Sequence, residues 1–536
     1  MSPTLRHSSI AQRLSLARVS LALIFTASLQ AQSIWDGGGV NADFLNAVNW
    51  TGDTAPTSAT TTQIQFAGSA NTSPVLNSDL QVGTITFNSG ASAFSVSGTG
   101  LISLDGAGSA GVNSNNQGII NNSSSLQTIS NAIKLTGNSI FTAASGSITL
   151  AGNVDTNGKQ LQLRAMSNGL TLELDGIISG SGGLVLRGPN NGNASTSIIR
   201  LGGANSFSGG IQLWGSNLRL ANDSALGSAA NTLLVGQSSL TDPISVLTEG
   251  NRTIAQSIRL TSKAVSGAYT IGGSDAATST YSGAITVNTT SATANSQTAM
   301  PLIVTAASGG RVNFTGGIIR DSASTGTGDT LIKSGAGIVA LSGTNTYSGT
   351  TTVNAGTLLI NGSLSSGGAA VTVADSAALG GSGTINRDVS VLDGATFTPG
   401  DFNSSSVSQA GTLTVNGALA FANTSILNFD LGSSSDLVAV SGNLTLDGVL
   451  NITAGSGFGV GTYELFSFTG TLFNNTLTLG TLPSGFTYAL DFSTANQVNL
   501  TVSAVPEPAT TAIILGVVAL GAVACTRRRR TQPIVS

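Results

Sequence analysis

Short apolar segments with a period of two recur along most of this 536-residue chain. Two apolar residues flank a third residue in each segment, as at Leu172 and Leu174 or at Leu444 and Leu446. Clusters of Gly, Asn, Ser and Asp separate the segments, as in the Leu-Asp-Gly triplets at 104–106, 174–176 and 446–448. The alternation predicts short β-strands, and the clusters predict tight turns. No long helix is expected before residue 509.

An internal repeat constrains the fold further, because residues 341–360 align without gaps with residues 201–220. The identical positions are Leu341 and Leu201, Gly343 and Gly203, Asn345 and Asn205, Ser348 and Ser208, Gly349 and Gly209, and Leu358 and Leu218, and Tyr347 aligns with Phe207. A unit of this size cannot bury its own apolar face and must stack on its neighbours. We therefore expect a solenoid with coils of roughly 20 to 30 residues and two or three strands in each coil.

The chemistry available to the chain is narrow. Its single His is His7 and its single Cys is Cys525, and both lie in terminal segments. Disulfide bonds, catalytic systems based on Cys or His, and zinc sites of imidazole or thiolate are thereby excluded from the body. Charged residues make up 8% of the chain, whereas 40% of its residues are hydrophobic and can supply a folded core.

The body is acidic. All 24 acidic residues lie between positions 32 and 508, where 13 basic residues leave a net charge of −11. The segment 388–526 contains nine acidic residues and no basic one. A nucleic-acid partner is therefore not expected, because nucleic-acid binding depends on clustered Lys and Arg.

Residues 1–31 have the pattern of a secretory signal peptide. Arg6, Arg13 and Arg18 form a basic region, an apolar stretch follows, and Ala31 is a small residue suited to signal peptidase. The mature chain is expected to start near Gln32. An amphipathic helix or a short membrane anchor is the alternative interpretation.

The C-terminus has a second ordered pattern. A Val-Pro-Glu-Pro motif at 505–508 precedes 18 uncharged residues at 509–526, and Arg527, Arg528, Arg529 and Arg530 follow. This length is near the minimum for a membrane-spanning helix, and the arginines would keep the C-terminus in the cytoplasm. The body would then face outward. A buried C-terminal helix is the alternative.

The triplet of Pro506, Glu507 and Pro508, the apolar helix and the arginine cluster together resemble the PEP-CTERM sorting signal of Gram-negative bacteria. We assign residues 504–531 to this signal. The resemblance implies recognition by a sorting protease of the exosortase type, cleavage near the motif, and delivery to the cell surface or the extracellular matrix. Cys525 would then lie at the cytoplasmic edge of the helix, as an apolar filler or as a lipidation site.

Residues 331–360 resemble the autotransporter-associated β-strand repeat, and residues 201–220 form a degenerate copy. Residues 379–503 are similar to the acidic C-terminal module of secreted proteins that pair such repeats with PEP-CTERM tails. The start of the chain after Trp35 is similar to the start of the same proteins. The resemblance implies an all-β fold: a right-handed parallel β-helix over 32–378, followed by a β module over 379–503 that either continues the solenoid or forms a separate sandwich. A single C-terminal transmembrane helix would complete the chain.

Several side chains could contact a ligand, but each has a structural interpretation. We expect Asn345 and Asn205 to stack at equivalent turns rather than to bind a ligand. Trp35 and Trp50 could stack on sugars, but capping the first coil is the preferred interpretation. Tyr347 and Phe207 are expected to pack on neighbouring coils, whereas Trp214, which replaces Asn354 of the better repeat, has no role that the repeat explains. Three mixed pairs are interpreted as solvated turn charges: Arg219 with Asp223, Arg320 with Asp321, and Arg387 with Asp388.

These features predict an exported, non-catalytic surface or matrix protein that is structural or adhesive and associates with exopolysaccharide or a cell-surface glycan. We assign no catalytic, cofactor or metal residue. Two alternatives stay open: a polysaccharide lyase or hydrolase on a β-helix, which would need acidic residues from different coils to converge on one face, and a tail-anchored envelope protein that retains its helix.

Overall fold

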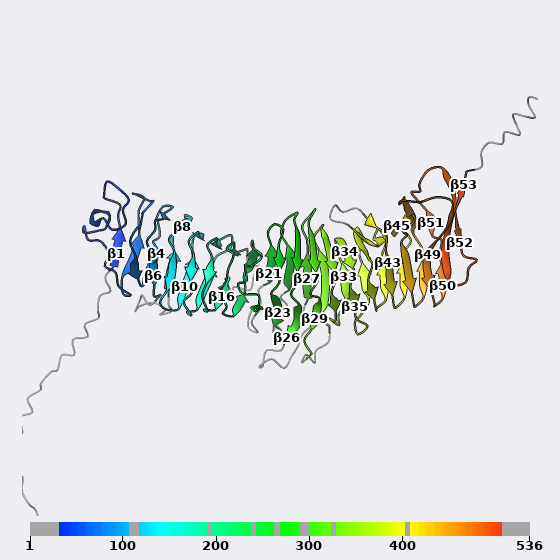
Figure 1. Cartoon of the computed structure of the whole chain (residues 1–536), viewed down its shortest axis with the longest axis horizontal. Helices are drawn as coiled ribbons and strands as arrows, with labels where there is room; N and C mark the ends of the chain where they lie inside the picture. The colour runs from blue at the N-terminus through cyan, green and yellow to red at the C-terminus, as the bar shows by residue number, and fades with distance from the viewer. Residues whose placement is uncertain are drawn as a thin grey trace, which may run out of the picture.

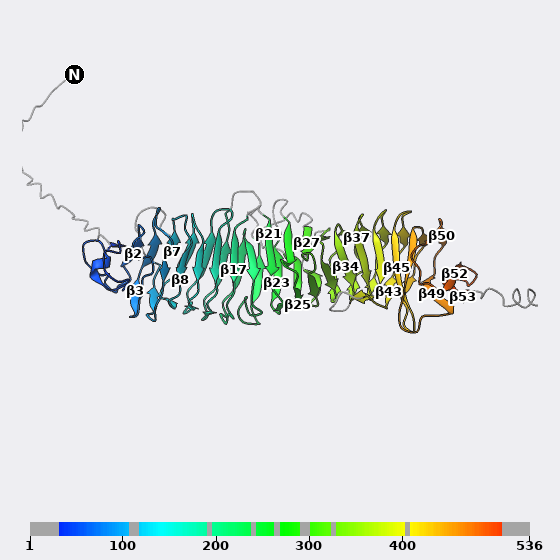
Figure 2. The same ribbon diagram turned by 90° about the horizontal axis from the view of Figure 1, so that it is seen from above.

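A computed structural model describes residues 32–106, 117–189, 196–236, 243–261, 268–289, 301–322, 328–402 and 408–505. These residues form a long rod of stacked coils, with the N-terminal and C-terminal coils at opposite ends (Figures 1 and 2). Nearly all strand pairs are parallel, and in the parallel sheets neighbouring strands come from successive coils. The expected all-β solenoid is thus confirmed, while the helix expected at 509–526 lies outside the described residues.

Three faces enclose the core, because each complete coil contributes three strands. One face carries a 12-stranded sheet and then an 8-stranded sheet, the second carries a 16-stranded sheet, and the third carries a 5-stranded and then a 10-stranded sheet. Paired positions on successive strands of the 16-stranded sheet lie 18 to 33 residues apart, as Val371 with Val389 and Tyr269 with Leu302 show. Coil length therefore varies around the expected period.

The 12-stranded sheet contains β1 (Gln32–Trp35), β2 (Gln63–Phe66), β4 (Thr84–Phe87), β7 (Gln117–Asn121), β10 (Ser139–Ala143), β13 (Leu161–Ala165), β16 (Leu184–Arg187), β18 (Ile211–Trp214), β20 (Thr232–Val235), β23 (Ser257–Thr261), β26 (Ile285–Thr289) and β29 (Ile318–Arg320). The 16-stranded sheet contains β5 (Ser95–Val96), β8 (Gln127–Ile129), β11 (Ile148–Leu150), β14 (Thr171–Leu174), β17 (Ile198–Leu201), β19 (Asn217–Leu220), β21 (Ile244–Thr248), β24 (Tyr269–Gly273), β27 (Pro301–Thr305), β30 (Thr330–Ser334), β33 (Thr351–Val353), β36 (Val371–Val373), β39 (Val389–Val391), β44 (Leu419–Phe421), β47 (Leu444–Leu446) and β50 (Leu472–Asn474).

The third face holds β3 (Leu80–Val82), β6 (Ile102–Leu104), β9 (Ile133–Leu135), β12 (Val154–Asp155) and β15 (Ile178–Ser179), and then β22 (Thr253–Ile254), β25 (Thr278–Tyr281), β28 (Arg311–Phe314), β31 (Ile338–Leu341), β34 (Gly356–Ile360), β37 (Ala377–Gly381), β40 (Thr396–Pro399), β45 (Ile426–Leu431), β48 (Val449–Ala454) and β51 (Thr478–Leu479). The 8-stranded sheet holds β32 (Thr344–Asn345), β35 (Ser363–Leu364), β38 (Thr384–Ile385), β43 (Thr412–Val415), β46 (Leu437–Val440), β49 (Gly461–Phe468), β53 (Gln497–Ala504) and β52 (Phe486–Asp491). A hairpin of β41 (Asp401–Phe402) and β42 (Ser408–Gln409) projects from the rod, and a 3₁₀ helix, η1, spans Ala47–Asn49.

Alternating side chains fill a single core along the rod. In most strands the buried residues alternate with partly exposed ones, as in β13, where Leu161, Leu163 and Ala165 are buried. The buried apolar residues of all coils form one continuous cluster. Since the inward positions of successive strands are in register, each inward side chain packs on those above and below it.

The two ends of the rod are closed differently. At the first coil Trp35 and Trp50 are fully buried and their rings meet edge to face, with centroids 5.2 Å apart. Trp50 Nε1 donates to the Phe44 carbonyl at 2.7 Å. The capping interpretation of these tryptophans is therefore confirmed, because neither ring is accessible to a sugar. At the other end, β53 pairs with β49 and β52 in antiparallel fashion and ends the parallel stacking of its sheet.

The sheets run without a break through the segment 379–503, and residue 379 itself lies within β37. The 16-stranded sheet reaches β50, and the 10-stranded sheet reaches β51. The same solenoid core thus continues from the repeat region up to the antiparallel end.

The two copies of the repeat use the same local plan on different faces. Asn345 lies in β32 on the face of the 8-stranded sheet, whereas Asn205 lies in a turn against β15 of the third face. Both asparagines are buried. Asn345 Oδ1 accepts a hydrogen bond from Ile318 N–H at 2.9 Å, and Asn205 Oδ1 accepts one from Ile178 N–H at 2.8 Å. The two asparagines therefore have the structural role between coils that the sequence predicts, but they lie on different faces, and Asn345 lies in a strand rather than in a turn.

The amide group of each asparagine also reaches the following coil. Asn345 Nδ2 donates to the carbonyls of Gly343 at 2.9 Å and Ser363 at 3.1 Å, and Asn205 Nδ2 donates to the Ala225 carbonyl at 2.7 Å. Each side chain therefore joins three successive coils. These backbone groups belong to short strands and to the turns beside them, and a buried side chain that both donates and accepts supplies each with a partner.

We predict that Asn345→Ala lowers the free energy of unfolding by about 2 to 4 kcal/mol, because the buried Ile318 N–H and the Ser363 carbonyl lose the side chain that pairs with them. Urea denaturation followed by far-UV circular dichroism measures the change. The matched control is Asn354→Ala, at an exposed position of the same repeat, with an expected change within about 0.5 kcal/mol. Equal effects of the two substitutions would contradict the bridging role.

Candidate functional site on the outer faces of the solenoid

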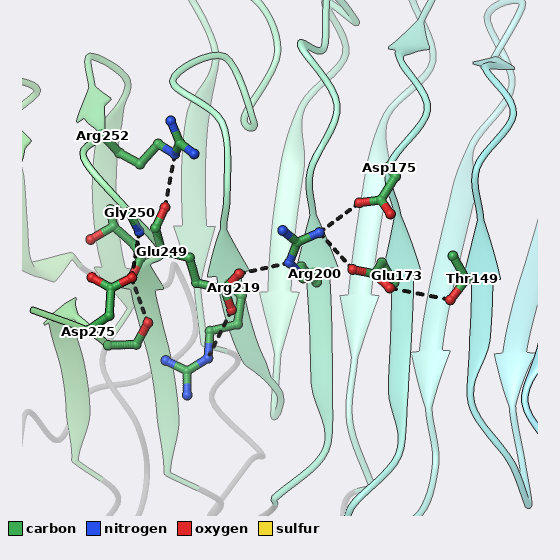
Figure 3. Close-up of polar contacts among 11 residues, drawn as sticks. Thr149, Glu173, Asp175, Arg200, Arg219, Glu249, Gly250, Arg252 and Asp275 are labelled. Atoms are coloured by element: carbon green, nitrogen blue, oxygen red, sulfur yellow. Dashed lines mark hydrogen bonds and ion pairs between the residues drawn. The ribbon is translucent and has the colours of Figure 1, made fainter. Parts of the chain in front are cut away.

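A row of charged side chains crosses the outer surface of the 16-stranded sheet (Figure 3). Parallel pairing places Arg200 of β17 beside Glu173 of β14 and beside Arg219 of β19. Arg200 Nη1 lies 2.7 Å from a carboxylate oxygen of Glu173 and 2.7 Å from one of Asp175. Its Nε lies 2.7 Å from a carboxylate oxygen of Glu249. One guanidinium thus contacts carboxylates from two other coils.

The row continues beyond Arg200 in both directions. The second oxygen of Glu249 lies 4.0 Å from Arg219 Nε, and Thr149 Oγ1 donates to Glu173 at 3.3 Å. Arg252 Nε donates to the Glu249 carbonyl at 2.9 Å. Glu173, Asp175, Arg200, Arg219 and Glu249 are called the charge ladder below.

Burial and charge act against each other on the two arginines. Partial burial lowers the pKa of the Arg200 guanidinium, but the hydrogen bond to Glu249 and the charges of Glu249, Glu173 and Asp175 outweigh it. The pKa of Arg200 is therefore raised from its ordinary value. For Arg219 burial outweighs the attraction of Glu249, so the pKa is lowered. Arg200, with three carboxylate oxygens 2.7 Å away, is the central cation of the charge ladder.

The charge ladder brings acidic residues of different coils together, which is the arrangement that a β-helix lyase or hydrolase needs. Each of the three carboxylates is already within ion-pair distance of Arg200, and their side chains are 26%, 45% and 31% exposed. Within the described ranges, no group of three or more His, Cys, Asp or Glu side chains is placed to hold a metal ion. Charge compensation between stacked side chains accounts for the geometry of the ladder.

The members of the mixed pairs named in the sequence analysis contact other residues instead of each other. Arg219 Nε lies 4.0 Å from a carboxylate oxygen of Glu249, and the Asp223 carboxylate accepts a hydrogen bond from Thr253 N–H at 3.1 Å. Arg320 donates to Ser348 Oγ at 3.1 Å. Asp321 pairs with Arg259 at 3.3 Å.

Arg387 is buried, so its interpretation as a solvated turn charge was wrong. Its guanidinium lies 4.7 Å from the centroid of the Tyr347 ring and donates to the carbonyls of Ser365, Gly349 and Tyr347. Three backbone acceptors and an aromatic face compensate the charge, although burial still lowers the pKa of Arg387. Tyr347 itself is buried, as expected for a residue that packs between coils.

The sequence analysis does not identify two further buried ionisable groups. Lys333, in β30, donates from Nζ to the carbonyls of Ser334, Gly335 and Ala355, and burial lowers its pKa to about 8. Burial raises the pKa of Asp436 to about 7, although the carboxylate accepts from Gly411 N–H and Asp430 N–H at 2.8 Å each. Both side chains hydrogen-bond to backbone groups, and no local sequence pattern predicts that role for an isolated Lys or Asp.

Trp214, for which the repeat gives no role, is partly exposed on the 12-stranded sheet. Its ring lies under the guanidinium of Arg187, 5.1 Å from the ring centroid to Cζ. The residues of the two sorting signals lie outside the described residues: Ala31 at the expected signal cleavage site, and Pro506, Glu507, Pro508, Arg527, Arg528, Arg529 and Arg530 at the C-terminus. Among the helices of the described residues, none has the length and apolar character needed to cross a membrane.

Comparison with known proteins supports the repeat. Residues 331–360 match the family described as the passenger-associated-transport-repeat, which confirms the autotransporter-associated repeat expected there. The chain is also 36% identical over 177 residues to the adhesin BmaC autotransporter of Brucella suis biovar 1 (strain 1330). The match covers 31% of this chain and 5% of that relative, so the chain spans a small part of the curated protein it resembles.

We predict that Arg200→Met destabilises the protein by about 1 to 2 kcal/mol at low salt, because three carboxylates lose their shared counterion. The loss should shrink at high ionic strength, which screens partly exposed charges. Thermal unfolding at two salt concentrations measures both effects. The control is Arg252→Met, whose guanidinium donates to the backbone carbonyls of Glu249 and Asn251. A loss that does not depend on salt would contradict an electrostatic role.

Proposed function

We propose that this chain is an exported, non-catalytic surface or extracellular-matrix protein that acts as a structural and adhesive rod. The observation that carries the proposal is the continuous parallel solenoid, whose strands bury one set of side chains and present the alternate set outward along the whole rod. Such a surface offers repeated hydrogen-bonding groups along the rod. Exopolysaccharide or a cell-surface glycan is the proposed partner.

The comparisons support this proposal in two ways. The repeat at 331–360 belongs to a kind that is named for transported passenger segments, and the curated relative is named as an adhesin and an autotransporter. Adhesion at the cell surface is carried over from that relative as part of the proposal.

The patterns at residues 1–31 and 504–531 support a proposal for export and sorting. We propose that residues 1–31 direct export and that residues 504–531 act as a PEP-CTERM signal, in which a sorting protease of the exosortase type recognises Pro506, Glu507 and Pro508. The helix at 509–526 would anchor the chain in the membrane before its release to the cell surface or the matrix of a Gram-negative bacterium. The charge order of these segments supports this topology.

A polysaccharide lyase or hydrolase is the second candidate. The observation that favours it is the convergence of Glu173, Asp175 and Glu249 around Arg200, since catalytic carboxylates of such enzymes lie close together. The ion pairs of Arg200 favour the structural interpretation over the catalytic one.

We predict that the exported protein, purified from the native producer, sediments with the producer's extracellular polysaccharide and with washed cells. Contacts along many coils should add up to tight overall binding, so the protein should stay with the polymer during washing. The same samples are assayed for reducing ends and unsaturated sugars. Absence of binding would refute the adhesive function, whereas sugar release that Glu173→Gln abolishes would establish the enzyme instead.

Mass spectrometry of the intact protein and of its C-terminal peptides tests the sorting proposal. We expect the surface and medium fractions to contain a chain that starts near Gln32 and lacks everything after the 506–508 region. Substitution of Pro506 and Pro508 by Ala should leave the unprocessed chain in the membrane fraction. A wild-type chain that still ends at Ser536 in the membrane would show a retained tail anchor and refute processing.

A further inference from the structure

The 12-stranded sheet differs from the 16-stranded sheet in its charges. None of its 12 strands contains Asp, Glu, Lys or His, but four of its positions are arginines: Arg164, Arg187, Arg259 and Arg320. Arg259 has an ion pair with Asp321, and Arg320 donates to Ser348. Within the described residues, Arg164 and Arg187 have no carboxylate within ion-pair distance. This is unusual in a chain whose net charge is −4.

The two arginines are neighbours in the sheet. Parallel pairing places Arg164 of β13 beside Arg187 of β16, and Arg187 beside Trp214 of β18. Adjacent strands are about 4.8 Å apart, so the three side chains form a row along the rod axis. This row of Arg164, Arg187 and Trp214 is called the basic row below.

Both guanidinium groups are held in place by neutral partners. Arg164 donates from Nε at 3.0 Å and from Nη2 at 2.6 Å to Oε1 of Gln162, which is two residues earlier on the same strand. Arg187 is held over the indole of Trp214. Neither contact cancels the positive charge, and Arg164 keeps three of its five N–H donors for another acceptor.

The two positive charges of the basic row repel each other, and no carboxylate compensates them within the described residues. Burial and the charge of Arg187 together lower the pKa of Arg164. In the charge ladder, by comparison, acidic neighbours raise the pKa of Arg200. An anion placed between Arg164 and Arg187 would remove the repulsion and use donors that are already oriented, which is the arrangement that a guanidinium site offers a carboxylate.

We propose that the basic row binds an acidic polysaccharide, with a carboxylate of a uronic acid residue between Arg164 and Arg187. Trp214 positions Arg187 and offers an apolar surface on which the sugar ring packs. A polymer lying along the rod axis meets both arginines in succession, because they are on adjacent coils. The inference rests on the proposed glycan-binding function and names the chemical class of the glycan.

Binding of the full exported protein to immobilised polygalacturonate tests the proposal, with dextran sulfate and neutral dextran as comparison polymers. We expect wild type to bind polygalacturonate and to bind it more weakly as ionic strength rises from about 0.01 to about 0.15 M. The double substitution Arg164→Gln and Arg187→Gln should weaken binding at least about tenfold, since two charge-assisted hydrogen-bonding groups are lost. Trp214→Ala should weaken it about threefold.

Arg259→Gln is the matched control, because Arg259 is on the same sheet but is paired with Asp321. Its binding should stay within about twofold of wild type, and circular dichroism checks that every variant is folded. If the double variant binds polygalacturonate as tightly as wild type, the site is refuted. Loss of dextran sulfate binding in the double variant, with no wild-type binding to polygalacturonate, would overturn the carboxylate assignment in favour of sulfate.

The experiments distinguish a failure of the basic row from a failure of the proposed function. If the double variant binds the producer's matrix as tightly as wild type does, the adhesive function stands and the basic row is refuted as its site. Binding to polygalacturonate through the two arginines, without any binding to the producer's matrix, would support the site and refute the function.

Discussion

Parallel hydrogen bonding between successive coils is the constraint on which the whole molecule depends. Each strand obtains its backbone partners from the coils before and after it, so no coil is stable alone. Inward side chains must then fit those directly above and below. Buried side chains such as Asn205 and Asn345 supply further hydrogen bonds between coils, to the N–H groups of Ile178 and Ile318. The ends of the stack have no next coil. Buried aromatic rings close the first coil, and antiparallel strands close the last.

The same stacking orders the outer surface. A residue type that recurs at one position of successive coils becomes a continuous row, and a row of like charges repels itself. On the 16-stranded sheet Arg200 is inserted between acidic side chains and the row is compensated. On the 12-stranded sheet Arg164 and Arg187 are adjacent and Gln162 and Trp214 hold them without adding negative charge. The two faces thus differ in their capacity to attract an external anion, although they share one backbone geometry.

The local features of the fold could be predicted from sequence because they repeat at short range. Period-two alternation gives the strands, and the aligned Asn205 and Asn345 give equivalent turns. Contacts between coils could not be predicted, because coil length varies from 18 to 33 residues and the register across coils is not local. For the same reason the convergence of Glu173, Asp175 and Glu249 and the pairing of Arg164 with Arg187 were missed. Burial of Arg387 was missed because its carbonyl acceptors are distant in sequence, and burial of Lys333 was missed because one of its three acceptors, the Ala355 carbonyl, comes from the next coil.

The positions of the two ends have a mechanical consequence. The first and last coils lie at opposite ends of the rod, and the hydrogen bonds between coils point along the rod axis (Figure 1). A pulling force applied between the ends therefore breaks these hydrogen bonds one coil after another, rather than many coils at once. Under tension the rod would yield from an end in steps, each releasing one coil of chain. Such stepwise lengthening dissipates energy and limits the force transmitted along the rod.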